Sequence, residues 1–231
     1  MAHPYWPLFD VEVRTPRLTL RAVTDEVATA LADLAARGVH DPSFAPFSVP
    51  WTEVGSPQLE RDVLRFHWRS RADASPSNWR VPFAAFVDDV VVGSTDLAAE
   101  DFSVLRQFET GSWLGREFQG QGLGTEMRIA TLTFGFVALD AEWATTRAWH
   151  DNGPSLGVTR AVGYEPEGSR RAVRRGQADT LLGFRMHRDH FDSELRRDDI
   201  DISGAAGVRG LLDIDGPDAS AAPDERRSPA S

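Results

Sequence analysis

Hydrophobic and polar positions follow two different rhythms along the body of the chain. Apolar or alternating runs of strand length lie at 17–21, 81–87, 90–97, 108–114, 142–149, 164–167 and 180–187. Apolar residues at helical spacing follow Thr24, follow Ser56, and recur at 125–139 and 152–163. Asp88 and Asp89, between two of the strands, indicate a hairpin turn. Two helices, an antiparallel hairpin and then alternating strands and helices predict an α/β fold with a mixed sheet.

The pattern fades near residue 191, where an acidic segment begins. Residues 192–231 contain ten acidic residues and five arginines, a net charge of −5 that is half of the −10 carried by the whole chain. No aromatic residue follows Phe191, and only 210–214 forms a short apolar patch. Such a composition is typical of disorder. The sequence therefore predicts a folded domain at residues 1–191 and an acidic, disordered tail at 192–231.

Composition excludes several classes of protein. All 25 basic residues are arginine, and the net charge of −10 argues against nonspecific binding of nucleic acid or of an anionic membrane. The absence of cysteine excludes disulfide scaffolds and thiol nucleophiles. No apolar run approaches the roughly 20 residues of a membrane span, and the first residues lack the features of a signal peptide. We therefore expect a cytoplasmic protein.

The glycine-rich stretch from Gln119 to Thr125 is the strongest candidate for a ligand site. It has glycine at 120, 122 and 124 and lies between a predicted strand and the longest predicted helix. Such a junction offers free backbone N–H groups and the positive end of the helix dipole to a phosphate. The spacing differs from that of a Rossmann loop, and a Walker loop would require lysine. A tight turn that needs positive φ is the structural alternative, but three glycines before a helix favour pyrophosphate binding.

Three blocks in order resemble the GNAT family of acyl-CoA transferases. Gln119, Gly122 and Gly124 match its Arg/Gln-x-x-Gly-x-Gly/Ala signature. Residues 109–114 are similar to the preceding strand, and 152–164 to the following helix, of the RimJ/RimL-type branch. The resemblance covers about residues 10–190. It implies the GNAT fold, which is a mixed, mostly antiparallel twisted sheet with a central splay, flanked by helices.

Other segments resemble a narrower, actinobacterial-type subgroup. These are 38–52, 111–115 and 124–128, and the subgroup includes a GNAT protein that prefers succinyl-CoA. The resemblance therefore leaves acetyl-CoA and succinyl-CoA open as donors.

The resemblance also implies a set of cofactor contacts. Pyrophosphate would bind the backbone amides from Gln119 to Thr125, the pantetheine arm would follow the strand that ends at Trp113 and Leu114, and Asn152 would bond to that arm. An amide near Leu114 would stabilise the oxyanion. The implied cofactor residues are Trp113, Leu114, Gln119, Gly120, Gln121, Gly122, Leu123, Gly124, Thr125 and Asn152.

Two residues are candidates for catalysis. Glu109 lies on the strand that leads to the thioester and is the candidate general base, although it could equally be an exposed strand carboxylate. By resemblance, Ser155 would approach the sulfur, whereas its structural alternative, like that of Asn152, is a helix cap. Many GNAT proteins have a tyrosine acid where this chain has Thr159. A thiol near pKa 8.5 leaves without one, so an essential acid is in doubt.

The sequence thus predicts an N-acyltransferase that moves an acetyl or succinyl group to a primary amine of a protein or small molecule. The first alternative is a weakly active GNAT-fold module that binds CoA or a partner as a sensor. The second is a nucleotide-binding α/β protein. The spacing of the six histidines does not match a metal site. We expect an acyl-CoA and an amine as partners, no nucleic acid or membrane, and an arrangement compatible with a homo-oligomer.

Overall fold

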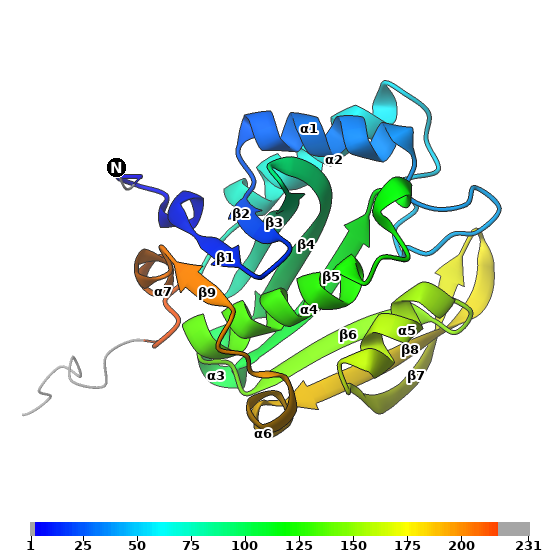
Figure 1. The fold of residues 1–231 in the computed structure, drawn as a ribbon. Helices are drawn as coiled ribbons and strands as arrows, with labels where there is room; N and C mark the ends of the chain where they lie inside the picture. Colours follow the sequence, from blue (N-terminus) through cyan, green and yellow to red (C-terminus); the bar gives the residue numbers. More distant parts are fainter. Residues whose placement is uncertain (1–2, 217–231) are drawn as a thin grey trace, which may run out of the picture.

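The computed structural model describes residues 3–216, which form a single sheet with helices on both faces (Figure 1). The strand order is β7-β8-β6-β5-β4-β3-β2-β1-β9, and every neighbouring pair is antiparallel except β5 and β6. The strands are β1 (Glu12–Arg14), β2 (Thr19–Ala22), β3 (Asn78–Val87), β4 (Val90–Glu100), β5 (Gln107–Leu114), β6 (Trp143–Trp149), β7 (Glu165–Arg174), β8 (Gln177–His187) and β9 (Asp201–Ser203). The predicted fold class, a mixed and mostly antiparallel sheet flanked by helices, is confirmed.

Four longer helices cover this sheet. They are α1 (Asp25–Arg37), α2 (Gln58–Ala72), α4 (Leu123–Thr133) and α5 (Gly153–Ala161). The π-helical segment η3 (Phe134–Ala138) continues α4 without a break. The short helices are η1 (Pro7–Asp10), α3 (Phe102–Leu105), η2 (Arg116–Phe118), α6 (Arg188–His190), η4 (Phe191–Leu195) and α7 (Ala206–Leu211).

Alternate residues of β3 enter two separate cores. Phe83 and Ala85 belong to the cluster that includes Met127 of α4, whereas Ala84 belongs to the cluster that includes Leu31 of α1. Since successive side chains of a strand point to opposite faces, α4 covers one face of the sheet and α1 with α2 covers the other. The predicted turn between β3 and β4 is also confirmed, because Asp88 and Asp89 have φ of 47° and 63°.

The sheet opens between β5 and β6. These parallel strands pair only over three positions, Gln107–Glu109 of β5 and Trp143–Thr145 of β6. Beyond them β5 continues along β4 as far as Leu114, while β6 continues along β8 as far as Trp149. The second half of each strand therefore has no ladder partner on the side that faces the other. This is the predicted central splay.

The boundary predicted at residue 191 is wrong for the part of the tail that the structure describes. β9 pairs antiparallel with β1, and α7 follows it, packed against η1. Val208, Leu212 and Ile214 are almost completely buried. These apolar residues are spread among acidic ones, so composition alone hid them, and β1 offered a free edge for pairing. The remainder of the predicted tail, 217–231, lies outside the described residues.

The last hairpin is longer than the hydrophobic pattern predicted. β7 and β8 run to a turn at Arg175 and Gly176, which have φ of 49° and 75°. Most of β7 is exposed. A strand without a buried face carries no apolar alternation, and for that reason only residues 164–167 and 180–187 stood out in the sequence.

Candidate active site

The glycine loop presents a row of free backbone donors at the start of α4. Gly122 is the N-cap of the helix, with φ of 79°, and Gly120 has φ of 72°. Within the described chain, none of the six backbone N–H groups from Gly120 to Thr125 donates to a protein acceptor, and the next one, that of Glu126, bonds to the Gly122 carbonyl. The dipole of α4 adds positive potential here. The loop therefore has the geometry of an anion site.

A buried carboxylate holds this loop from behind. Glu126 accepts hydrogen bonds from the Thr15 hydroxyl (2.6 Å), the Arg17 backbone N–H (3.0 Å) and Arg17 Nε (2.5 Å). Arg17 Nη1 also donates to the Gln121 carbonyl (3.0 Å). These hydrogen bonds lower the pKa of Glu126 against the opposing effect of its burial, which is the largest single influence on it. The contacts join the segment before β2 to the first turn of α4.

The side chain of Gln119 forms hydrogen bonds within the protein. Its Nε2 donates to the carbonyls of Val39 (2.6 Å) and Leu114 (2.9 Å). The amide thus ties the end of β5 to the chain after α1 and fixes where the glycine loop begins. Of the predicted cofactor residues, Gln119 positions the loop through its side chain.

The loop, the end of β5 and α5 come together at Gly124. A Cβ built there would lie 3.6 Å from Val158 and 3.7 Å from Leu114. At the start of α5, Asn152 is the N-cap, and its Oδ1 accepts from the Ser155 backbone N–H (3.2 Å). Nδ2 of Asn152 donates to the Pro46 carbonyl (3.4 Å). Asn152 therefore caps α5, which is the structural role predicted as its alternative. Ser155 is half-buried and lies one helical turn before Thr159.

Two carboxylates lie on the α1–α2 face of β4 and β5. Glu109 is about 39% exposed, and its Oε2 accepts from Arg147 Nη1 of β6 (2.6 Å). Asp96 of β4 lies opposite Gly111, and its Oδ2 is 3.1 Å from the place that a Cβ of Gly111 would take. Burial raises the pKa of Asp96, although its ion pair with Arg80 acts in the other direction. No local pattern in the sequence indicated Asp96, because the residue that lies opposite it depends on the register of the two strands.

A buried arginine fills the splay from the opposite face. Arg128 of α4 is only 4% exposed and donates to hydroxyl groups of both separated strands: Thr110 and Ser112 on β5, and Thr146 on β6. The helical spacing of α4 placed Arg128 between apolar residues of the core. The sequence alone could not show that a charged side chain enters this gap.

The loop at 39–57 crosses from α1 to the far half of the sheet. Trp51 packs on Trp113 with ring centroids 5.6 Å apart, and Phe47 packs on Trp51 at 5.1 Å. Trp149 Nε1 donates to the Phe47 carbonyl (3.2 Å), and Arg174 Nε to the carbonyl of Ala45 (2.8 Å). This aromatic loop bridges the two strands that bound the splay. The indole of Trp113 packs against Trp51 of this loop.

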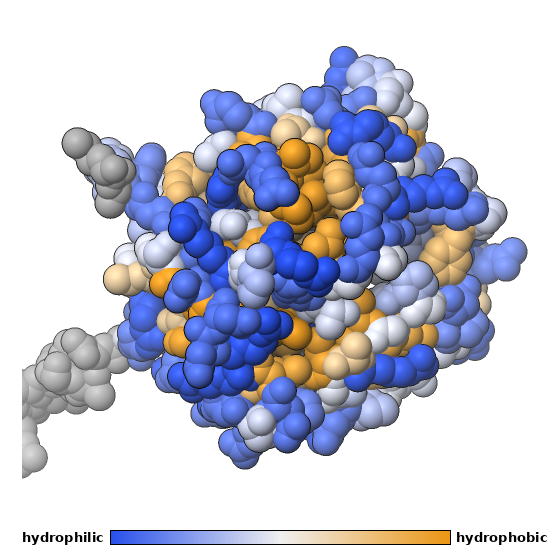
Figure 2. All heavy atoms as spheres, viewed as in Figure 1, coloured by the Kyte–Doolittle hydropathy of each residue, from blue (hydrophilic) through white to orange (hydrophobic). Residues whose placement is uncertain are grey.

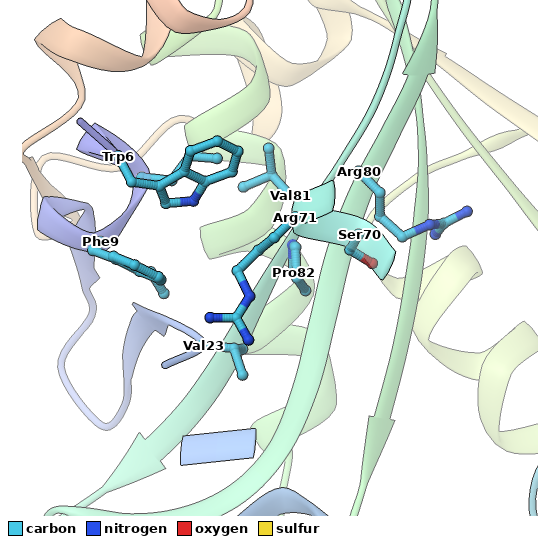
Figure 3. A pocket seen from close by; sticks show the side chains of 10 residues that line it. Trp6, Phe9, Val23, Ser70, Arg71, Arg80, Val81 and Pro82 are labelled. Carbon is cyan, nitrogen blue, oxygen red and sulfur yellow. The ribbon is translucent and has the colours of Figure 1, made fainter. Parts of the chain in front are cut away.

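The surface around the glycine loop and the splay has features of a ligand site. On the face drawn in Figure 2, apolar residues gather at the centre, between α1 and α4, within a polar surround. An open recess of about 340 Å³ beside the loop is lined by Arg37, Gly38, Arg116 and Glu117. By contrast, the cavity between Trp6, Phe9 and Arg71 (Figure 3) holds about 20 Å³, which suits a water molecule and no substrate.

Residues 3–216 contain neither a group of three metal-ligating side chains nor a helix long and apolar enough to span a membrane.

Comparison with known proteins identifies the family. Residues 17–165 match the model of the acetyltransferase (GNAT) domain. The chain belongs to the GNAT acetyltransferase family. RimL, a ribosomal-protein α-N-acetyltransferase solved with coenzyme A, is 18% identical over 75% of this chain and 95% of its own, with a TM-score of 0.61. A ribosomal-protein-alanine acetyltransferase from Vibrio fischeri is 15% identical over 81% and 100%, also with a TM-score of 0.61.

Further structural neighbours give the same fold. A GNAT acetyltransferase from Bacillus anthracis is 15% identical over 77% of this chain and 99% of its own, with a TM-score of 0.62. At these identities the similarity concerns the fold. The predicted membership of the GNAT family is confirmed. In this GNAT chain the free amides of the glycine loop lie beside the splay.

Proposed function

We propose that this GNAT protein is an acyl-CoA-dependent N-acyltransferase, which moves an acetyl or a succinyl group from CoA to a primary amine of a protein or small molecule. The observation that carries the proposal is the row of free N–H groups from Gly120 to Thr125 at the start of α4, directly beside the splay. A pyrophosphate on these amides would direct the rest of the cofactor between the separated strands.

The cofactor would hold its thioester along β5. The pantetheine arm has amide groups, and the second half of β5 lacks a ladder partner on its β6 side, so the arm can complete the hydrogen bonding there. A backbone N–H near Leu114 would stabilise the oxyanion of the tetrahedral intermediate. Arg37 and Arg116 of the recess would add positive charge for the phosphate on the ribose of CoA, and Glu117, which pairs with Arg37 (3.4 Å), offsets part of it.

The reaction follows from that placement. The amine nitrogen attacks the thioester carbonyl, the C–N bond forms, and the C–S bond breaks with its electron pair on sulfur. The proton that the amine loses passes to a carboxylate or to water. The CoA thiolate leaves with a hydrogen bond from the Ser155 hydroxyl, or it takes a proton through Ser155, which regains one from water. Glu109 is our candidate base. The competing candidate is Asp96, which lies on the same face of the sheet, opposite Gly111 of β5. Holding both reactants in place contributes much of the rate.

The decisive test is release of CoA thiol from acetyl-CoA and from succinyl-CoA with a panel of amines. The panel contains peptides with free N-termini, lysine peptides, polyamines and aminoglycosides. Thiol release that depends on both the donor and one amine class supports the transferase. Tight CoA binding without turnover on any amine would favour the sensor alternative. Displacement of CoA by ATP or NAD would favour the nucleotide-binding alternative.

A further inference from the structure

Arg128 connects the two strands at the point where they separate. Its Nη1 donates to Oγ1 of Thr110 (2.6 Å) and of Thr146 (3.1 Å), and its Nη2 donates to Oγ of Ser112 (3.0 Å). Thr110 follows directly after Glu109, the last residue of β5 that pairs with β6. The guanidinium therefore lies at the closed end of the splay.

The guanidinium of Arg128 makes no ion pair within the described residues. An arginine side chain keeps its proton in proteins, yet the three partners of Arg128 are neutral hydroxyl groups. Its Nε is buried without an acceptor, and no carboxylate oxygen in the described part of the chain lies within 4 Å of the guanidinium. Asp96, on the other face of the sheet, pairs with Arg80, and the charge of Arg128 acts on the pKa of Asp96 only from a longer distance. A buried unpaired cation is costly, so an arriving anion would gain strongly from it.

The acyl end of the cofactor would reach this cation, an argument that rests on the proposed function. With the thioester carbonyl at the backbone N–H near Leu114, the acyl chain extends back along β5. A strand rises about 3.4 Å per residue, so Ser112 lies roughly 7 Å from Leu114. A four-carbon acyl chain has a comparable length. Its far end would then arrive beside Ser112 and Arg128, away from the solvent.

We propose that Arg128 selects the acyl donor, and that its guanidinium binds the terminal carboxylate of a dicarboxylic acyl-CoA such as succinyl-CoA. The planar guanidinium matches a carboxylate in a two-point contact. The hydroxyl groups of Thr110 and Thr146 donate to the carbonyls of Thr145 (3.2 Å) and Thr110 (3.2 Å), and on binding they would turn from these acceptors to the same carboxylate. The methyl group of an acetyl donor has no such partner and would leave the cation uncompensated.

The first experiment uses the wild-type protein without an acceptor. Calorimetry compares the affinities of CoA, acetyl-CoA, butyryl-CoA and succinyl-CoA. Butyryl-CoA matches the four-carbon chain of succinyl-CoA but ends in a methyl group. Hydrogen bonds to a charged group contribute about 1.5–3 kcal/mol, so we expect succinyl-CoA to bind roughly 10- to 100-fold more tightly than butyryl-CoA. Equal affinities would overturn the proposal.

The second experiment removes the charge. Arg128→Gln should reduce the preference for succinyl-CoA over butyryl-CoA to within about threefold, whereas the affinity for free CoA reports on the loop alone. Arg69→Gln, which removes an exposed arginine of α2, is the matched control and should keep the preference. If the Arg128→Gln protein binds CoA and still prefers succinyl-CoA as strongly as the wild type, a group other than Arg128 selects the donor.

A third variant covers the case in which Arg128→Gln does not fold. Ser112→Asp places a carboxylate next to the guanidinium and supplies the missing counter-charge, so it should weaken succinyl-CoA binding but not CoA binding. An unchanged preference in that variant contradicts the proposal. These results are distinct from a failure of the proposed function: if free CoA itself does not bind, the cofactor assignment is wrong, and if all CoA thioesters bind equally, only the role of Arg128 is wrong.

Discussion

At the scale of single residues, Gly122 has the conformation on which the anion site depends. Its φ of 79° lies in the left-handed region, which β-branched residues avoid, and its Cβ would point to Arg17 at 3.4 Å. We predict that Gly122→Val lowers CoA affinity by at least 100-fold, while the protein still melts cooperatively. Calorimetric titration with CoA measures the loss.

The matched control is Gly157→Ala in α5, where an added Cβ has no neighbour within 4 Å. It should bind CoA like the wild type. Gly124→Ala is a second comparison, because its Cβ would make only ordinary contacts with Val158 and Leu114. A Gly122→Val protein with unchanged CoA affinity would contradict the phosphate-loop assignment.

A separate prediction concerns the base. Glu109→Gln should lower kcat by about 10²–10⁴-fold at neutral pH, the usual contribution of a general base. CoA affinity should stay nearly constant, because the phosphates lie at the loop. The defect should shrink as pH rises, because a larger fraction of the acceptor amine is then neutral. Steady-state rates across pH provide the measurement.

Asp96→Asn is the matched comparison for Glu109→Gln, since both carboxylates lie on the same face of β4 and β5. Burial raises the pKa of Asp96, so any role as a base would require pH above that raised value. A loss found only in Asp96→Asn would move the role from Glu109 to Asp96. If neither variant is slow, water accepts the proton.

The residues that the sequence could and could not reveal differ in a physical way. The glycines at 120 and 122 were recognisable because a local chain conformation requires them. Arg128 and Asp96 were not, because their importance arises from what lies across the splay or the strand pair. When the role of a side chain depends on which residue of another strand lies beside it, the surrounding sequence shows no pattern that reveals that role.

At the scale of elements, α2 contains a buried histidine that should make stability depend on pH. His67 is 2% exposed, and burial, aided by repulsion from Arg71, lowers its pKa to about 4 from 6.5. The folded state therefore keeps His67 neutral while the unfolded chain takes up a proton. Stability is complete above about pH 6.5 and falls as pH drops towards 4, by up to about 3 kcal/mol at 1.36 kcal/mol per pKa unit.

Urea unfolding between pH 4 and pH 7 tests this dependence. His67→Leu should flatten the pH profile between those values, because the leucine has no proton to gain. A His67→Leu protein with an unchanged slope would show that other groups cause the acid sensitivity.

The same contrast between local and long-range signals explains which elements were predictable. α1, α4 and the hairpin of β3 and β4 follow from periodicity and turn residues, and all appear close to the expected positions. β9 and most of β7 were missed because both are short of buried side chains. Each is held mainly by backbone pairing with a neighbour, which a hydrophobic pattern cannot reveal.

At the scale of the whole molecule, the C-terminal segment closes the edge of the sheet where the chain begins. β9 adds a strand beside β1, and Arg209 of α7 donates from Nη1 to the Ala138 carbonyl at the end of η3 (3.0 Å). Gly204, with φ of 73°, lets the chain pass against the backbone of Asp10, where a Cβ would overlap the carbonyl. The segment therefore joins the start of the chain to the end of the long helix.

We predict that truncation after Asp199 strongly destabilises the protein. The deletion removes β9, α7 and the buried side chains of Ile200, Val208, Leu212 and Ile214. Each buried aliphatic side chain contributes about 1.5–3 kcal/mol, as an upper bound. A total loss of about 5 kcal/mol would lower Tm by roughly 10–20 °C in a chain of this size. Thermal unfolding, followed by circular dichroism, measures the shift.

Two controls separate lost packing from the mere shortening of the chain. Truncation after Gly216 keeps the contacts of β9 and α7 that the structure describes, and it should leave Tm within about 2 °C of the full-length value. Ile214→Ala in the full-length chain should cost about 2–5 kcal/mol because Ile214 is fully buried. Leu211→Ala, at a partly buried position, should cost less. If truncation after Asp199 left Tm unchanged, β9 and α7 would not contribute to stability in solution, and the folded domain would end near residue 191 after all.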